Sequence, residues 1–113
     1  RVAAELTRQW EAKGIRVHYI PDLYYKSNEQ ATEYLAQRGL KPGSHAALSD
    51  TSELMALDAE GRWIRRDKLA PGTAANGVDG DPRQASVELG ERLIKFKVDA
   101  AVAQIRAQLA QRR

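Results

Sequence analysis

The chain has no cysteine and no long apolar run, and only two of its 113 residues are histidines. The lack of cysteine excludes disulfides, thiol nucleophiles and cysteine-ligated zinc sites. No run approaches the roughly 20 apolar residues that a membrane-spanning helix needs, so we expect no membrane segment. Chemistry that depends on an imidazole must therefore use His18 or His45.

The composition that remains is that of one modest globular domain. The net charge of +3 comes from 18 basic and 15 acidic residues that are well mixed along the chain. The sharpest basic run, residues 62–68, includes Trp63 and would suit contact with phosphate, but such a run is also typical of a solvated surface. We therefore expect no nucleic-acid partner. Because the chain begins with Arg1 rather than methionine, and a helix starts at once, we expect a longer precursor.

The first 20 residues predict a helix followed by a strand. Val2, Leu6 and Trp10 recur every four residues, which predicts a helix that ends near Gly14. Residues 15–20 are rich in β-forming side chains and are followed by Pro21, which predicts a strand. A helix, a single glycine and a strand in this order are typical of an α/β layer fold.

Three further helices are predicted from their N-terminal signals. Ser27 to Gln30 form a capping-box pattern, and the helix would run to about Arg38. Asp50 to Glu53 repeat the pattern before a helix to Leu57, whose buried face would be Leu54, Met55 and Leu57. Asp81-Pro82 predicts the start of a helix that runs to about Gln111. The residues between, 58–81, predict an irregular connection with a short strand at Trp63-Ile64.

The last predicted helix has an apolar stripe that a chain of this size cannot cover alone. We therefore expect the stripe to pack against other protein. Its members are Leu89, Leu93, Phe96, Ala101, Ile105 and Leu109.

The segment from Gly43 to Leu57 holds the candidate chemical site. His45 lies in a Gly/Ala-rich turn, five residues before Asp50. An imidazole in such a turn can give and take protons near neutral pH, although His45 is equally compatible with an ordinary surface histidine. Asp50 has two interpretations: an acid that orients the ring or a substrate N–H, or an N-cap with no catalytic role. Both remain open at this stage.

Two other patterns indicate structure rather than chemistry. His18 is predicted to be structural or solvent-facing, and no ligand spacing supports a zinc site made with His45. Residues 76–81 superficially suggest a calcium loop but lack its register and its terminal Glu, so they predict a turn and a helix cap.

Three features, taken in order, resemble the C-terminal part of the creatininase family of metal-dependent amidohydrolases. The segment from His45 to Leu57 is similar to the family's His-(Ala/Gly)-Gly-x-x-Glu-Thr-Ser motif. Residues 80–90, Gly-Asp-Pro-Arg-Gln-Ala-Ser-Val-Glu-Leu-Gly, are similar to its Gly-Asp-Pro…Ala…Gly segment, and a long closing helix follows. The resemblance spans nearly the whole chain, which is under half of the family's usual length.

The resemblance implies an α/β layered fold with a largely parallel sheet. Residues 1–113 would be the incomplete C-terminal portion of a single such domain, ending in a long helix. It also implies hydrolysis of a non-peptide or cyclic amide by a pair of divalent metal ions, often zinc or manganese. His45 matches the family's histidine that assists proton transfer to the departing nitrogen. Asp50 falls where the family most often has Glu.

The resemblance also places part of the site outside this chain. The family's metal-binding residues lie in an N-terminal half, so no metal ligand is assigned here. The expected partners are that N-terminal portion or a second chain of a homo-oligomer, and a small-molecule amide. Lys41 stands where creatininases have a Trp that covers the substrate ring, and Ala47 replaces a Gly, so creatinine itself is not the expected substrate. The alternative is a non-catalytic structural or interaction module that keeps the fold without a working site.

Overall fold

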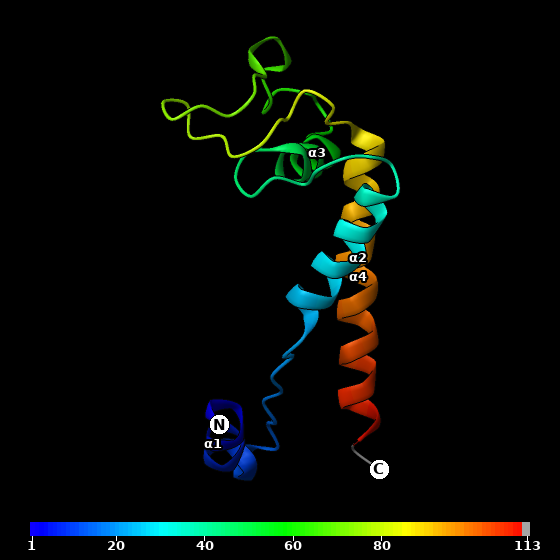
Figure 1. Cartoon of the computed structure of the whole chain (residues 1–113). Helices are drawn as coiled ribbons and strands as arrows, with labels where there is room; N and C mark the ends of the chain where they lie inside the picture. Colours follow the sequence, from blue (N-terminus) through cyan, green and yellow to red (C-terminus); the bar gives the residue numbers. More distant parts are fainter. Residues whose placement is uncertain (112–113) are drawn as a thin grey trace.

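The computed structural model describes residues 1–111 and shows a helical chain with an N-terminal arm (Figure 1). Within these residues no β-sheet forms, and the single strand-like pairing is an isolated antiparallel bridge between His45 and Asp79. The prediction of an α/β layered fold with a largely parallel sheet is therefore wrong. The elements in chain order are α1 (Val2–Trp10), the 3-10 turn η1 (Glu11–Lys13), α2 (Leu23–Ala36), α3 (Leu48–Leu57), the 3-10 turn η2 (Arg66–Lys68) and α4 (Val87–Ala110).

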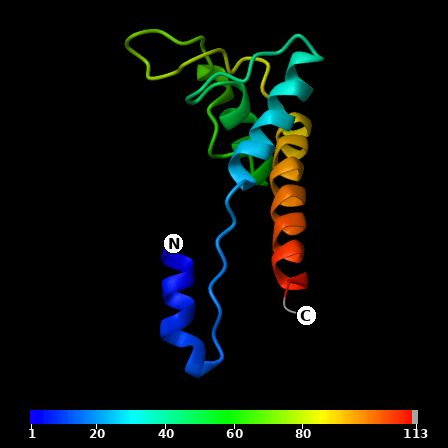
Figure 2. The same ribbon diagram turned by 60° about the horizontal axis from the view of Figure 1, so that its bottom comes forward.

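The predicted strand at residues 15–20 is extended but has no strand beside it (Figures 1 and 2). A β-forming sequence becomes a strand only where a neighbouring strand supplies hydrogen-bond partners. Here the Thr7 side chain of α1 supplies hydrogen-bond partners at one residue of the segment, Val17. The N–H of Val17 donates to Thr7 Oγ1 at 3.0 Å, and the Thr7 hydroxyl lies 3.2 Å from the Val17 carbonyl oxygen. The second predicted strand, at Trp63-Ile64, is also wrong, because these residues lie in a loop.

The arm consists of α1, η1 and the extended segment. The predicted first helix is confirmed, and Gly14 closes it with a left-handed backbone and an N–H bond to the Glu11 carbonyl oxygen at 2.9 Å. Within the arm, α1 lies apart from the other helices in both views (Figures 1 and 2), whereas His18 of the extended segment reaches Gln108 of α4 at 3.4 Å.

The core forms where α2 and α3 pack on the N-terminal half of α4. Four leucines make its centre: Leu35 of α2, Leu48 of α3, and Leu89 and Leu93 of α4. Partly buried side chains surround them, among them Ala31, Tyr34, Leu40, Ala85 and Phe96. The C-terminal half of α4 extends past this core, so the molecule is 56 Å long.

The crossing of α3 and α4 is built from small residues. A side chain at Gly90 would overlap the Ser52 carbonyl and would come within 2.9 Å of Ala56 Cβ. Ser52 is fully buried there, and its hydroxyl oxygen accepts the N–H of Ser86 at 3.3 Å. This packing explains why a glycine interrupts an otherwise unbroken helical sequence.

The predicted starts of three helices are wrong. α2 begins at Leu23, so Ser27 lies inside it, buried, and donates its hydroxyl to the Leu23 carbonyl at 2.8 Å. α3 begins at Leu48 with Ala47 as N-cap, which places Asp50 in the first turn. α4 begins at Val87.

The residue that caps α4 is a serine, not the aspartate that was predicted. Ser86 is the N-cap, and its hydroxyl oxygen accepts the N–H of Leu89 at 3.1 Å. Asp81, the predicted cap, precedes a separate turn that the Ala85 N–H closes on the Pro82 carbonyl at 2.9 Å. The prediction of one long final helix is confirmed.

The predicted buried face of α3 is only partly right: Met55 is buried, whereas Leu54 and Leu57 are exposed and small residues near the crossing are buried instead. In α4, Leu89 and Leu93 are buried and Phe96 is partly buried. Ile105 and Leu109 are 46% and 45% exposed, in keeping with the prediction that the chain alone cannot cover the stripe.

The long connection from residue 58 to residue 86 is irregular apart from η2, as predicted. Asp58, 8% exposed, anchors its first turn and accepts the Trp63 N–H at 2.6 Å. Burial raises the pKa of Asp58, but the N–H groups of Trp63, Arg62, Ile64 and Gly61 outweigh it and hold the pKa below its usual value. In the described part of the chain, no helix combines the length and the apolar character needed to cross a bilayer.

Candidate functional site

The turn that carries His45 is held by the first turn of α3. Ala46 adopts a left-handed backbone conformation, with φ of 49°, which costs an alanine some strain. Its N–H donates to Asp50 Oδ2 at 2.9 Å, and the Thr51 hydroxyl donates to its carbonyl oxygen at 3.2 Å. Asp50 therefore binds the backbone beside His45. Among the described contacts it makes none with the imidazole.

The two segments that suggested a family resemblance contact each other. Residues 43–47 lie against residues 78–81, 35 positions later in the sequence. The Asp79 N–H donates to the His45 carbonyl oxygen at 2.9 Å, and the Ser44 N–H donates to the Asp79 carbonyl oxygen at 3.0 Å. The Ser44 hydroxyl also bonds the Asp79 carboxylate. Three hydrogen bonds thus fix the His45 turn to the loop before Asp81.

Glycine and alanine make this approach possible. Gly43 has φ of 69°, and a side chain there would overlap Ala47 Cβ and lie 2.6 Å from the Asp79 carbonyl oxygen. A side chain at Gly80 would lie 2.8 Å from Ala47 Cβ. Ala47 is 1% exposed, so its methyl group fills the space between the two loops. Ala47 therefore serves as packing between the two loops.

A cavity of about 690 Å³ opens beside this junction. It offers a cationic side chain, two carboxylates, a hydroxyl and an amide to a polar ligand. His45 is exposed and is not among its lining residues. The lining comprises Gly39, Lys41, Pro42, Gly43, Ser44, Asp79, Gly80, Asp81 and Gln84.

No protein-family model, no curated protein and no solved structure matches this chain. The resemblance to creatininases therefore rests on the quoted motifs alone.

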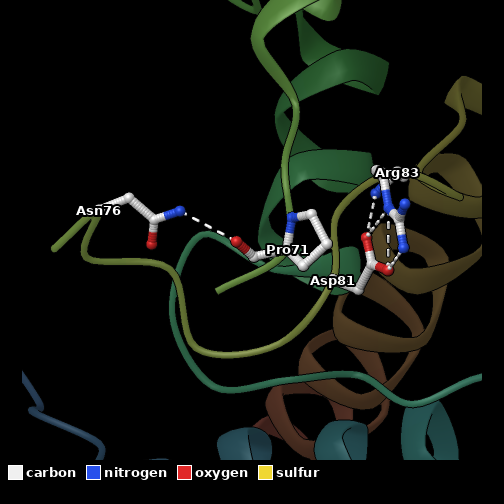
Figure 3. A network of polar contacts seen from close by, with 4 residues as sticks. All are labelled: Pro71, Asn76, Asp81 and Arg83. Carbon is white, nitrogen blue, oxygen red and sulfur yellow. Dashed lines mark hydrogen bonds and ion pairs between the residues drawn. The ribbon is translucent and has the colours of Figure 1, made fainter. Parts of the chain in front are cut away.

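The far rim of the cavity is fixed by an ion pair. Arg83 binds the Asp81 carboxylate with both its Nε, at 2.9 Å, and Nη2, at 2.6 Å (Figure 3). This hydrogen bonding and the charge of Arg83 lower the pKa of Asp81 to about 2. The pairing keeps Asp81 anionic and turns its carboxylate toward Arg83.

A second small network shapes the loop that leads to this junction. Asn76 donates its side-chain amide to the Pro71 carbonyl at 3.0 Å (Figure 3). Its Oδ1 accepts the N–H groups of Thr73 at 2.9 Å and Val78 at 3.1 Å. These bonds close a turn, as predicted for residues 76–81, but the predicted helix cap is wrong because Ser86 rather than Asp81 caps α4.

The two histidines are not brought together. His18 lies in the arm, exposed, with Nδ1 3.4 Å from Gln108 Oε1 of α4, whereas His45 lies on the loop junction beside α3. Over residues 1–111 no three His, Asp or Glu side chains gather as potential metal ligands.

The sequence did not predict that Ser44, Asp79 and Gln84 line a cavity beside the His45 turn. Lys41, which also lines it, was noted only for its position before the motif. None has a distinctive local pattern. The usable signal was the pair of glycine-containing motifs, since Gly43 and Gly80 mark places where two backbones approach closely.

Proposed function

We propose that this chain supplies His45 to a metal-dependent amidohydrolase that cleaves a non-peptide or cyclic amide. The contact between residues 43–47 and residues 78–81 is the observation that supports the proposal most strongly. The contact brings the turn that carries His45 next to a polar cavity that a small molecule could enter, which supports the proposal.

In this proposal His45 donates a proton to the nitrogen that leaves when the amide bond breaks. An exposed imidazole on a turn held by backbone bonds can reach a substrate without first breaking an internal contact. Asp50 acts as a positioning residue, because its carboxylate fixes the N–H of the neighbouring Ala46. The departing group and the scissile carbonyl would both belong to a small-molecule substrate. This substrate would enter from the side of the cavity.

The divalent metal ions implied by the resemblance would supply an activated water and polarise the carbonyl. Their ligands would have to come from a further polypeptide, either an N-terminal portion of the same protein or a second chain. We accordingly expect residues 1–113 alone to show no amide hydrolysis with added zinc or manganese.

The test compares the two histidines in this chain assembled with the polypeptide proposed to supply the metal ligands. His45→Ala should lower kcat for hydrolysis of a small cyclic amide by about 10²- to 10⁴-fold, the usual contribution of general acid–base catalysis. His18→Ala is the matched control, since it removes the same side chain from the arm, and it should leave kcat unchanged. If the His45→Ala protein keeps kcat within about twofold of an active wild type, the assigned role is wrong.

A second candidate function is a non-catalytic interaction module. The observation that favours it is the apolar face that the C-terminal half of α4 leaves exposed. Leu93 belongs to the predicted stripe but is 1% exposed and lies in the core, so it is not part of this exposed face. A full-length protein that forms its complex but hydrolyses no amide with either metal would favour this module.

A further inference from the structure

The C-terminal half of α4 carries a second apolar face on the side away from the core. Val98, Val102, Ile105 and Leu109 are 52%, 38%, 46% and 45% exposed. Their spacing of four, three and four residues places them in one line along the helix. At 3.6 residues per turn this line lies far around the helix from Leu93, which packs into the core.

This line has the spacing of a coiled-coil seam. Apolar residues that alternate between steps of three and four suit packing against a second helix with the same pattern. The C-terminal half of α4 meets α2 on another side, where Ala100, Ala103 and Gln104 line a hollow with Lys26 and Gln30. The end of α4 extends past α2 and α3 in both views (Figures 1 and 2). The charged residues beside the seam decide which helix fits.

We propose that the seam binds a second copy of this chain, with the two α4 helices antiparallel. In this register Val98 lies opposite Leu109 of the second copy, and Val102 lies opposite Ile105 of the second copy. All four apolar residues then pair within one symmetric contact, centred between residues 103 and 104.

Charge complementarity supports the antiparallel direction. Asp99 and Arg106 each follow a seam residue directly, so they flank the seam on the same side. In the antiparallel register Asp99 of one copy lies near Arg106 of the other, and the symmetry repeats the pair. A parallel register would instead place Arg106 near Ala101 and Asp99 near Ile94, with no opposite charges. Within its own copy Asp99 binds Lys95 at 2.8 Å, and Arg106 has no salt bridge among the described residues.

The position of the core also favours this arrangement. The helices α2 and α3 pack on the N-terminal half of α4. Antiparallel pairing of the C-terminal halves places the two cores at opposite ends, whereas parallel pairing would place them side by side. Because the seam is only about 12 residues long, it buries less than the roughly 800 Å² per partner of a standard interface, and we expect a dissociation constant on the order of 10–100 µM.

Sedimentation equilibrium of the wild-type chain over this concentration range is the first measurement. Val102→Asp and Ile105→Asp should each weaken dimerisation by at least about 10-fold, because they place a charge in the seam. Ala107→Asp is the matched control: it introduces the same side chain at an exposed position of the same half-helix, off the seam. A wild type that stays monomeric, or a dimer that all three variants weaken equally, overturns the proposal.

Charge exchange tests the direction without touching the seam. Asp99→Arg and Arg106→Asp should each dimerise several-fold more weakly than wild type, because each creates two like-charge contacts. Mixed together, the two variants should form a heterodimer more tightly than either self-associates, since every pair then has opposite charges. No preference for the heterodimer would contradict the antiparallel register.

Disulfide formation gives a second, independent readout, because the chain has no cysteine of its own. A mixture of Val102→Cys and Ile105→Cys chains, one carrying a mass tag, should oxidise mainly to the mixed dimer. Two cysteines must come within about 7 Å between their Cα atoms to form this bond. Predominant same-position dimers would identify a parallel pair and overturn the proposal.

Discussion

The ion pair between Asp81 and Arg83 gives the cavity rim a direct pH signature. Arg83 lowers the pKa of Asp81 from 3.8 to about 2, so the carboxylate is favoured in the folded chain. The pair's contribution to stability is therefore complete above pH 3.8 and is lost as the pH falls through about 2. Because both side chains are largely exposed, we expect this contribution to be small.

Carboxyl chemical shifts measured by NMR against pH test this directly. Asp81 should titrate near pH 2, and Arg83→Ala should return its pKa toward 3.8. Arg62→Ala is the control, because Arg62 is an equally exposed arginine that pairs with Glu60 instead. A wild-type Asp81 that titrates near 3.8 would show that the bidentate contact does not persist in solution.

Ser27, Asp50 and Asp81 illustrate what capping patterns can and cannot locate. Each was predicted to begin a helix, and a helix does occur near each one, but none of the three caps it. Ser27 is buried inside α2, Asp50 binds the Ala46 N–H, and Asp81 binds Arg83. The same short polar side chains serve caps, turns and ion pairs, so tertiary contacts decide which use prevails.

Gly90 shows how one element depends on another. In an isolated helix, Gly→Ala stabilises by about 1 kcal/mol. At Gly90 the added methyl group would meet the Ser52 carbonyl of α3, and overpacking of this kind typically costs about 1–3 kcal/mol or more. Since the obstacle is backbone rather than a flexible side chain, we expect Gly90→Ala to destabilise the chain by about 2 kcal/mol net.

Urea unfolding followed by circular dichroism measures this change. Ala107→Gly calibrates helix propensity at an exposed position of α4, where it should destabilise by about 1 kcal/mol. If Gly90→Ala instead stabilises the protein, as propensity alone requires, α3 and α4 do not cross as closely as described here.

The helices were largely predictable because their periodicity and breakers are local, whereas the sheet was predicted from a segment that needs a partner. Ile15, Val17 and Tyr19 satisfy the pattern of a strand, yet Val17 bonds a threonine of α1. The candidate site was likewise predictable only where its residues are close in the sequence. His45 and Asp50 were visible in one stretch of sequence, but the contact with Asp79 joins segments that no local pattern relates.

The arm and the helical core differ in how much apolar surface they bury, and therefore in how easily they open. Among the described hydrogen bonds, one joins the arm to α4, between His18 Nδ1 and Gln108 Oε1 at 3.4 Å. A second, next to the arm, runs from the Asp22 N–H at the start of α2 to Gln104 Oε1 at 3.3 Å. The core contains every leucine that is buried. In the extended segment, residues 15–20, Val17 and Ile20 are partly buried and the other side chains are exposed. Opening of the arm therefore exposes little apolar surface and should cost little free energy.

Native-state hydrogen exchange resolves this difference at single amides. Among the described hydrogen bonds, none involves the N–H of Arg16, His18 or Ile20, so these amides should exchange at nearly unprotected rates. Val17, which donates to Thr7 Oγ1, should be slower than its neighbours, and Gly90 at the α3–α4 crossing should be among the slowest.

Replacement of the acceptor identifies its role. Thr7→Val keeps the shape of the side chain but removes the oxygen, so Val17 should accelerate to the rate of Arg16 while Gly90 is unchanged. Thr32→Val is the control, because Thr32 is exposed on α2 and has no part in the arm. Uniform strong protection of residues 15–20 would mean that a neighbouring strand covers this segment in solution, and that the unpaired arm is not its resting arrangement.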